Sequence, residues 1–264
     1  MSALHDDGSQ FAGIYYREVV KTFRNPWVIL ITLAQPFMWL AFFGSSFSGL
    51  SCAEIESIFH TPTCNYVTFL LPGVLATSML TIGMFGAMSV IQDKRLGYLK
   101  RVLITPTRKS TIFLAKALGA TTRGLVQFPV MIVAAFFFGV SYATMSPLFW
   151  AGWVLPLFLL GLGFSSLYLI VTAHSTDWQT PGVLSNFITM PLMFSSQALF
   201  PAQNFPWWMQ GISSVNPVTY AATFGRNAIV YGTGSWIDLG YLAIFAVAML
   251  LIGFGVYARF LRVE

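Results

Sequence analysis

The segment IQDKRLGYLKRVLITPTRKS, residues 91–110, is a short basic island in an otherwise apolar chain. Six of the fourteen Lys and Arg residues lie in it: Lys94, Arg95, Lys100, Arg101, Arg108 and Lys109. It is flanked on both sides by apolar runs long enough to cross a bilayer as helices, which takes about 20 residues each. The island therefore separates two predicted membrane spans, and its charge places it on the cytoplasmic side.

The composition predicts an all-α protein with several membrane spans. Charged residues make up 9% of the 264 residues and hydrophobic residues 56%, whereas about 25% charge is typical of a soluble domain. The net charge of +5 is gathered in a few places. That pattern is typical of residues that orient a protein in a membrane and not of a nucleic-acid-binding surface. We expect residues 1–264 to form a single transmembrane domain.

Six spans are expected, preceded by a helix that lies along the membrane surface. The spans cover residues 27–47, 66–91, 111–140, 148–172, 181–200 and 236–260. The third is too long for one crossing, so we expect its first turns, with Lys116 and Arg123, to protrude or lie at the interface. Within residues 1–26, apolar side chains recur at helical spacing opposite Arg17, Lys21 and Arg24. This pattern predicts a cytoplasmic amphipathic helix.

The distribution of Lys and Arg predicts that both termini are cytoplasmic. With the N-terminus inside, thirteen of the fourteen basic residues lie on the cytoplasmic side, in agreement with the positive-inside rule. The expected outer segment, residues 48–65, has no Lys or Arg. The exception is Arg226, which we expect to be paired because a charge at membrane depth needs a partner. Asp238, Glu54 and Glu56 are the candidate partners.

The two cysteines of the chain, Cys52 and Cys64, fall together in the outer segment. Disulfides persist outside the cytoplasm, and closing so short a loop is worth about 3 kcal/mol in the chain-entropy model. We expect a disulfide here; the alternative is two free thiols. His60 lies nearby, but the spacing matches no zinc signature, so no metal site is expected.

Residues 200–232 are too rich in Pro for one span and too apolar for a soluble loop. We expect two short re-entrant or interfacial helices that enter from the outer side, with Trp207 and Trp208 in the aromatic belt. Non-helical backbone at this depth must be buried in protein or face water. A structural role is therefore favoured for Arg226 over a contact with a transported molecule.

Several motifs are absent from the sequence. It contains no G-x-x-x-x-G-K-[ST] phosphate-binding loop, so we do not expect the chain itself to be an enzyme that hydrolyses nucleotides. Metalloprotease and nucleophile-elbow motifs are also missing. Few carboxylates lie inside the spans and no internal repeat is visible, which argues against an ion-driven carrier. An ATP-independent secondary carrier or channel is nevertheless the alternative function.

The basic island also carries an apolar stripe. Leu96, Leu99, Val102 and Leu103 recur at helical spacing, and Pro106 should end the helix. A loop that only sets the topology would not need this stripe. We therefore interpret the island as a short amphipathic helix that contacts a partner surface or the membrane interface.

The island resembles the cytoplasmic loop of ABC-2 type transporter permeases, in which acidic and basic residues and a glycine precede leucines and a Thr-Pro pair. The matching residues are Asp93, Lys94, Arg95, Gly97, Leu99, Leu103, Thr105, Pro106 and Arg108. Tyr98 and Lys100 stand where the family often has Glu. A second resemblance is SSVNPVTYAATFGRNA, residues 213–228, whose Asn216, Pro217 and Tyr220 form an N-P-x-x-Y motif followed by Arg226. The resemblance covers essentially the whole chain and is close in kind to drug-export and nodulation-factor-export permeases.

The resemblance implies one half of an exporter in a bacterial plasma membrane. Two copies of the permease would pair and work with two separate ATP-binding subunits, which bind ATP and Mg²⁺. The island would be the coupling helix, with Leu99 and Leu103 as its buried anchor and Arg95, Arg101 and Arg108 as its polar rim. The cargo would be amphipathic or hydrophobic: a drug-like molecule, a lipid or a lipid-linked glycan.

By the same resemblance, the second and fifth spans would line a route for the cargo at the interface between the two copies. They offer Met79, Met84, Phe85, Met88, Phe187, Met190, Met193 and Phe194. Flexible thioethers and aromatic faces suit varied lipophilic cargo. The alternative is that these side chains only face lipid or pack between helices.

Overall fold

The computed structural model describes residues 2–60, 62–98, 102, 108–140, 142, 147–173, 175 and 177–260, and each element found there is helical. The expected all-α membrane fold is confirmed. In chain order the elements are α1 (Ser2–Phe23), α2 (Pro26–Ser46), α3 (Cys52–Phe59), α4 (Tyr66–Arg95), α6 (Lys109–Leu125), α7 (Gln127–Phe137), α8 (Pro147–Val171), α9 (Thr180–Phe194), the 3₁₀ turn η1 (Ala202–Asn204), α10 (Trp207–Val215), α11 (Pro217–Tyr231) and α12 (Trp236–Phe260).

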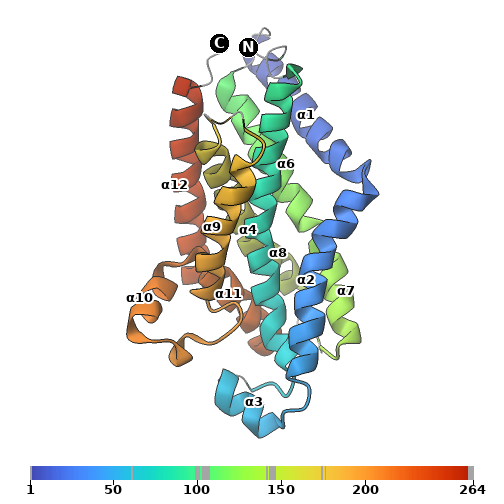
Figure 1. Cartoon of the computed structure of the whole chain (residues 1–264), viewed down its shortest axis with the longest axis vertical. Coiled ribbons are helices and arrows are strands. Elements are labelled where there is room, and N and C mark those ends of the chain that lie inside the picture. The colour runs from blue at the N-terminus through green and yellow to red at the C-terminus, as the bar shows by residue number, and fades with distance from the viewer. Residues whose placement is uncertain are drawn as a thin grey trace.

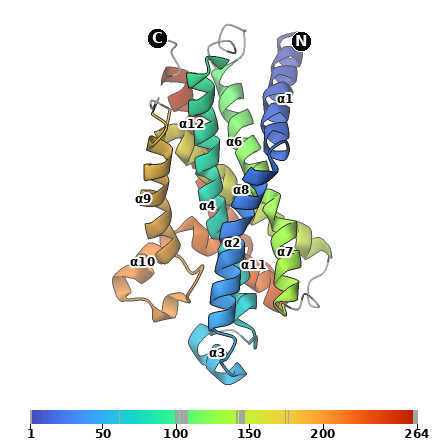
Figure 2. The same ribbon diagram turned by 45° about the vertical axis from the view of Figure 1, so that its right-hand side comes forward.

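Both ends of the chain lie at one end of an elongated helical bundle, and α3 lies at the other end (Figure 1). We call these the terminal end and the α3 end. α2, α4 and α12 run between them, and α6 continues into α7 to do the same (Figures 1 and 2). Such a path returns the chain to its starting side, as the predicted even number of crossings requires.

Five helical segments of the described chain are long and apolar enough to cross a membrane: Ile29–Ser46, Tyr66–Arg95, Lys109–Phe137, Gly152–Val171 and Trp236–Arg259. They correspond to five of the six expected spans. The expected span at 181–200 is too long, because α9 ends at Phe194 after 15 residues. A helix of that length covers about 22 Å, less than the roughly 30 Å of hydrocarbon.

The centre of the bundle is formed by α4 and α8, which are the most deeply buried of the spanning helices. They pack against each other and both contact α6 and α11, and α8 also packs against α12. The aromatic side chains of Trp153, Phe164 and Tyr168 on α8 are almost fully buried there. α2 and α12 expose most of their apolar surface instead, as expected for helices that face lipid or another protein chain.

The end of α9 is explained by Asn216. Its amide nitrogen donates to the Leu192 carbonyl oxygen at 2.7 Å and to the Ser195 hydroxyl at 3.2 Å. The same side chain accepts from the Val218 backbone nitrogen at 3.0 Å and caps the start of α11. One residue thus satisfies the last turn of α9 and the first turn of α11, both of which leave backbone groups without helical partners. Pro217 follows at the first position of α11, where its missing N–H has no cost.

Arg226 holds the non-helical segment that follows α9. Its guanidinium donates to the backbone carbonyls of Gln197 and Ala198, the latter at 2.9 Å, and to that of Phe69 at 2.9 Å. It also stacks on the Phe69 ring, 3.5 Å from the ring centroid. The predicted pairing of Arg226 with Asp238, Glu54 or Glu56 is therefore wrong. Its partners are carbonyl oxygens, because the broken backbone supplies acceptors that hydrocarbon cannot satisfy.

Two tyrosines complete the packing around this segment. The Tyr66 hydroxyl donates to the Leu199 carbonyl oxygen at 3.1 Å. Tyr220, the last residue of the N-P-x-x-Y motif, donates to the Ser214 carbonyl oxygen and stacks on Tyr241 of α12, with 4.4 Å between ring centroids. The motif therefore fixes α10 and α11 to the rest of the bundle.

The loop between α2 and α4 contains α3, which the sequence did not reveal. Ser51 and Glu54 form a capping box, in which the Ser51 nitrogen donates to the Glu54 carboxylate at 2.8 Å. These hydrogen bonds lower the pKa of Glu54. Cys52 and Cys64 are joined by a disulfide, with their Cα atoms 4.4 Å apart. The bond closes the loop at the α3 end of the bundle.

We predict that Gly73→Ala destabilises the protein by about 2–3 kcal/mol or more, which is typical of overpacking. A Cβ atom at Gly73 would lie 1.9 Å from the Ala198 carbonyl oxygen that Arg226 holds. Thermal unfolding in detergent measures the effect. The control is Gly240→Ala on α12, where a new Cβ meets nothing within 4 Å and should leave stability unchanged or slightly improved. Equal melting temperatures for the two variants would contradict the proposed close packing.

Candidate functional site

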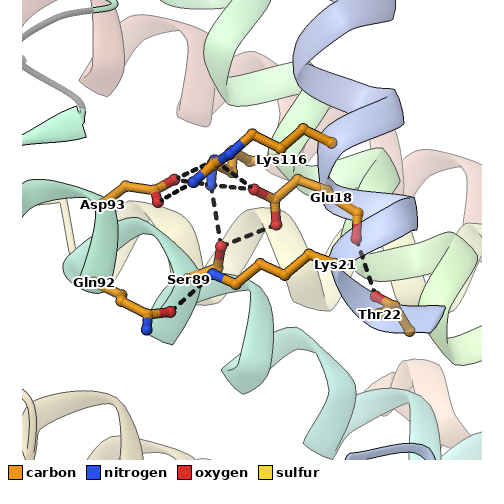
Figure 3. Close-up of polar contacts among 8 residues, drawn as sticks. Glu18, Lys21, Thr22, Ser89, Gln92, Asp93 and Lys116 are labelled. Atoms are coloured by element: carbon orange, nitrogen blue, oxygen red, sulfur yellow. Dashed lines mark hydrogen bonds and ion pairs between the residues drawn. The ribbon is translucent and has the colours of Figure 1, made fainter. Parts of the chain in front are cut away.

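Four charged side chains meet near the terminal end of the bundle: Arg17 and Glu18 from α1, Asp93 from α4 and Lys116 from α6. We call this group the ion cluster. Figure 3 shows Glu18, Asp93 and Lys116 converging with Ser89 on one point between three helices. Asp93 is also part of the basic island, whose first residues form the last turns of α4.

The local sequence places these side chains on facing surfaces. Ser89 and Asp93 are one helical turn apart on α4 and share a face. Gly119 on α6 lets α1 approach closely, because a Cβ atom there would lie 2.8 Å from the Cβ of Glu18. The small residue thus brings the Glu18 carboxylate within reach of Lys116, which lies one turn earlier on α6.

Lys116 is the centre of the cluster. Its ammonium donates to the Glu18 carboxylate at 2.5 Å, to the Ser89 hydroxyl at 3.0 Å and to the Asp93 carboxylate. An ammonium has three hydrogens, and all of them are used here. The Ser89 hydroxyl in turn donates to the second Glu18 oxygen at 2.9 Å. Lys116 is only 2% exposed, so this complete set of partners makes its burial tolerable.

Arg17 completes the cluster from the side of α1. It donates to both carboxylate oxygens of Asp93, at 3.0 and 2.8 Å, in the bidentate geometry that favours strong Arg–carboxylate pairs. Hydrogen bonding to Asp93 raises the pKa of Arg17. The guanidinium also lies 3.8 Å from the centroid of the Tyr98 ring. Arg17 thereby joins α1 both to the end of α4 and to Tyr98 in the part of the basic island that follows it.

The charges of the cluster balance. Arg17 and Lys116 contribute two positive charges, and Glu18 and Asp93 contribute two negative charges, so the sum is zero. A buried, balanced set adds little net stability relative to an apolar one, but removing one member leaves an uncompensated charge and costs about 3–5 kcal/mol. The cluster therefore acts as a specific joint: it holds α1, α4 and α6 in one arrangement and penalises others.

Two of these residues also figured in the sequence analysis. The first turns of α6, with Lys116, were expected to protrude or lie at the membrane interface, and the structure shows that α1 covers Lys116 there and supplies its counter-charge. Asp93 was expected in the ATPase-coupling set, but its carboxylate is 1% exposed and faces α1 and α6. In this structure Asp93 holds the base of the island from within and presents no carboxylate at the surface.

The described part of the basic island turns away from α4 at Gly97, whose φ of 69° lies in the left-handed region that favours glycine. Lys94 donates to the carbonyl oxygens of Ala173 and Ser175, at 2.5 and 3.2 Å, and so binds the segment after α8. Arg95 is half exposed and lies 3.8 Å from Asp177. Arg108 precedes the first turn of α6 as its N-cap residue. Leu99, Arg101, Leu103, Thr105 and Pro106 lie outside the described residues.

Comparison with known proteins places this joint in a family context. The family model described as ABC-2 type transporter matches residues 9–230 of the chain. That match includes the ion cluster, the basic island and the N-P-x-x-Y motif. The protein belongs to the ABC-2 type transporter family. Members of this family are membrane subunits that work with ATP-binding subunits in ABC transporters.

Three relatives of this ABC-2 permease illustrate the range of the family. A protein named as transport permease ycf38 from Cyanophora paradoxa is 25% identical over 255 residues, covering 90% of this chain and 84% of the relative. The daunorubicin resistance ABC transporter permease protein DrrB1 of Streptomyces coeruleorubidus is 24% identical, covering 81% and 72%. Nodulation protein J of Sinorhizobium fredii is 28% identical, covering 88% and 86%.

The predicted route residues of the permease lie in three different environments. Met79 is fully buried, with its sulfur against Gly124 of α6 and Gly161 of α8. Met84, Phe85, Met88 and Met193 are half-buried. Phe187, Met190 and Phe194 on α9 are exposed by 77%, 61% and 51%. A single chain thus does not bring all eight into one surface: Met79 belongs to the packed core, and the α9 residues form an outward apolar face.

The sequence interpretation missed Glu18, Ser89 and Lys116 as members of a site. Two signals were available. Lys116 is a lone cation in a long apolar run, and such residues are commonly paired. Glu18 lies on the polar side of an amphipathic helix, where a solvated side chain is the usual interpretation. Their pairing depends on α1 packing against α6, and no pattern within either helix predicts that contact.

We predict that Asp93→Asn and Lys116→Met each destabilise the permease by about 3 kcal/mol or more, because each leaves the buried cluster with a net charge. The double variant restores the balance and should lose clearly less than the sum of the two changes. Unfolding of the purified variants measures this coupling. Asp177→Asn is the control: it removes an exposed carboxylate and should cost under about 1 kcal/mol. Additive losses in the double variant would refute the joint.

Proposed function

We propose that this chain is the transmembrane subunit of an ATP-driven exporter, and that the ion cluster transmits movement from the basic island into the bundle. The observation that supports this role is the position of the cluster. Its residues join α4, which ends at the island, to α6, which begins after it, and both to α1. A displacement of the island would therefore act on three helices together.

The connection from the basic island to the ion cluster through the first turns of α6 is short and stiff. From Lys109 at the start of α6 to Lys116 is about 10 Å along the helix axis. Lys94 ties the same region to the segment after α8 through two carbonyl oxygens. Packed helices respond to such a force by shifting between discrete arrangements rather than by deforming. A small helix seated in an ATP-binding subunit can thus tilt α4 and α6 as rigid bodies.

The energy would come from a partner. The sequence contains no phosphate-binding loop, so ATP and Mg²⁺ would be bound by two separate ATP-binding subunits beneath two copies of this permease. Leu99 and Leu103 would anchor the island in these subunits, with Arg95, Arg101 and Arg108 at the rim. Gly97, Thr105 and Pro106 would shape the turn at either end.

The cargo would pass between the two copies. The exposed face of α9, with Phe187, Met190 and Phe194, and the half-buried face of α4 offer flexible thioethers and aromatic rings to amphipathic or hydrophobic molecules. One relative is named for daunorubicin resistance, which supports a drug-like cargo, and another for nodulation; a lipid or a lipid-linked glycan is the other proposed cargo. In this proposal the terminal end of the bundle is cytoplasmic, and transport runs toward the α3 end.

We predict that Leu99→Asp leaves membrane insertion unchanged but abolishes cargo-stimulated ATP hydrolysis and transport in the complex with the ATP-binding subunit. Burying a carboxylate in an apolar groove without a partner is strongly unfavourable. Co-purification of the two subunits, ATPase activity and transport in vesicles measure the effect. Transport at the wild-type rate would refute the coupling role of the island.

The matched control is Ile58→Asp. Ile58 is an exposed apolar residue of α3, at the opposite end of the bundle. The same chemical change there should leave subunit association and ATP hydrolysis intact. If Ile58→Asp also prevents association, the loss in Leu99→Asp reflects misfolding and does not support coupling.

We also predict the orientation in the membrane. Cys52 and Cys64 should react with an impermeant maleimide from the outer side after reduction with an impermeant reagent. In a Cys52→Ser, Cys64→Ser background, Arg259→Cys, which lies in the last turn of α12, should react only after the membrane is permeabilised. Labelling of Arg259→Cys in intact cells would reverse the proposed direction.

A further inference from the structure

Arg123 is a cation with unused donors. It lies on α6, seven residues and about 10 Å beyond Lys116 along the helix. Its Nε and one terminal nitrogen are buried and have no hydrogen-bond partner among the described residues. The guanidinium instead covers the Phe85 ring, 4.7 Å from the centroid. An aromatic face compensates only part of the charge of a desolvated guanidinium, and the described part of the chain supplies no anion that hydrogen-bonds to it.

Gln127 lies one helical turn further on, at the start of α7, and is 2% exposed. Both its amide oxygen and its amide nitrogen are buried without a hydrogen-bond partner in the described chain. Arg123 and Gln127 line the same small cavity, together with Thr22, Ile29, Thr32, Leu33 and Val126. The cavity has room for about one oxygen atom, about 10 Å³.

The ion cluster cannot supply the missing negative charge. Glu18 is the carboxylate that acts electrostatically on Arg123, but its oxygens are bound by Lys116 and Ser89. The cluster is also neutral as a whole. A water molecule in the cavity would fill the space but leave the charge of Arg123 uncompensated.

An apolar groove leads directly to this cavity. The groove, of about 440 Å³, runs between residues 26–37 of α2 and 130–134 of α7, and each residue that lines it is apolar. Ile29 and Leu33 line both the groove and the cavity. The groove opens on the surface of the bundle, because its lining residues Leu30, Phe37 and Val130 are exposed. α7 lies on the other side of α2 and α4 from α9 in both views (Figures 1 and 2), so the groove is remote from the apolar face of α9.

We propose that this groove and cavity bind one anionic glycerophospholipid from the leaflet at the terminal end. An acyl chain lies in the groove between α2 and α7, and one headgroup phosphate oxygen accepts from Arg123 and Gln127. The occupant needs both an apolar tail and a negative oxygen, and the surrounding membrane supplies both in one molecule. Its role is to fix the start of α2 against α6 and α7, beside the joint that α1 makes with the ion cluster. This inference does not depend on ATP-driven export.

The test compares the purified protein in two vesicle compositions: phosphatidylcholine alone and phosphatidylcholine mixed with phosphatidylglycerol. We expect the wild type to melt at a higher temperature in the mixture and to retain phosphatidylglycerol in native mass spectrometry. Arg123→Gln should retain it about tenfold less or weaker still, as expected for the loss of a charge-assisted hydrogen bond. Arg123→Lys should keep part of the binding, since it keeps the charge without the planar fork.

Two further variants keep the test decisive if Arg123→Gln folds poorly. Arg259→Gln removes an exposed cation at the same end of the bundle and should retain phosphatidylglycerol like the wild type. Ala34→Phe fills the groove without touching the charge, and should reduce retention by displacing the acyl chain. The proposal is overturned if the melting temperature is the same in both vesicles, if Arg123→Gln and Ala34→Phe retain the lipid normally, or if Arg259→Gln loses it equally.

Discussion

The structure depends on the rule that no backbone polar group inside a membrane protein can be left without a partner. α9 ends after 15 residues, and the chain then continues as irregular backbone toward α10. Asn216 satisfies the last turn of α9, and Arg226 and Tyr66 satisfy the carbonyls that follow. The N-P-x-x-Y motif and its arginine are thus explained by hydrogen bonding at a break. They let the short helices α9, α10 and α11 follow one another without leaving the backbone of the break unsatisfied.

At the terminal end of the bundle, the same requirement for partners applies to charged side chains. Glu18, Asp93 and Lys116 can be buried there because Arg17 completes the charge balance from the edge and because Lys116 finds three acceptors. Such an arrangement contributes little to net stability and much to specificity, since it is complete in only one packing of α1, α4 and α6. A joint of this kind suits a protein that must pass a displacement from one helix to the next without losing its fold. Arg123 lies just beyond it, outside the balance, which is why we assign its counter-charge to lipid.

In the proposed mechanism, the break after α9 and the ion cluster at the terminal end act together. The apolar face of α9 points outward from the bundle, and the last turn of α9 is fixed by Asn216. α4 packs against α9, and the last turns of α4 are held by the ion cluster. In the proposed mechanism, a tilt of α4 would therefore also displace α9, with the Asn216 contact and the ion cluster as the two fixed points. Met79, which packs against glycines of α6 and α8, would move with the core and not with the lining of a route.

The sequence by itself determined most of the helices, most of the spans and the resemblance to the family, because run length, composition and short motifs are local properties. It also placed Cys52 and Cys64 in one loop. Only the tertiary structure decided where α9 stops, what Arg226 binds and that Lys116 is buried. Asn216 acts on α9 from 24 residues away, and Glu18 meets Lys116 across 98 residues. These partners are set by the packing of distant helices, and no periodicity within a single helix encodes which face of another helix it will meet.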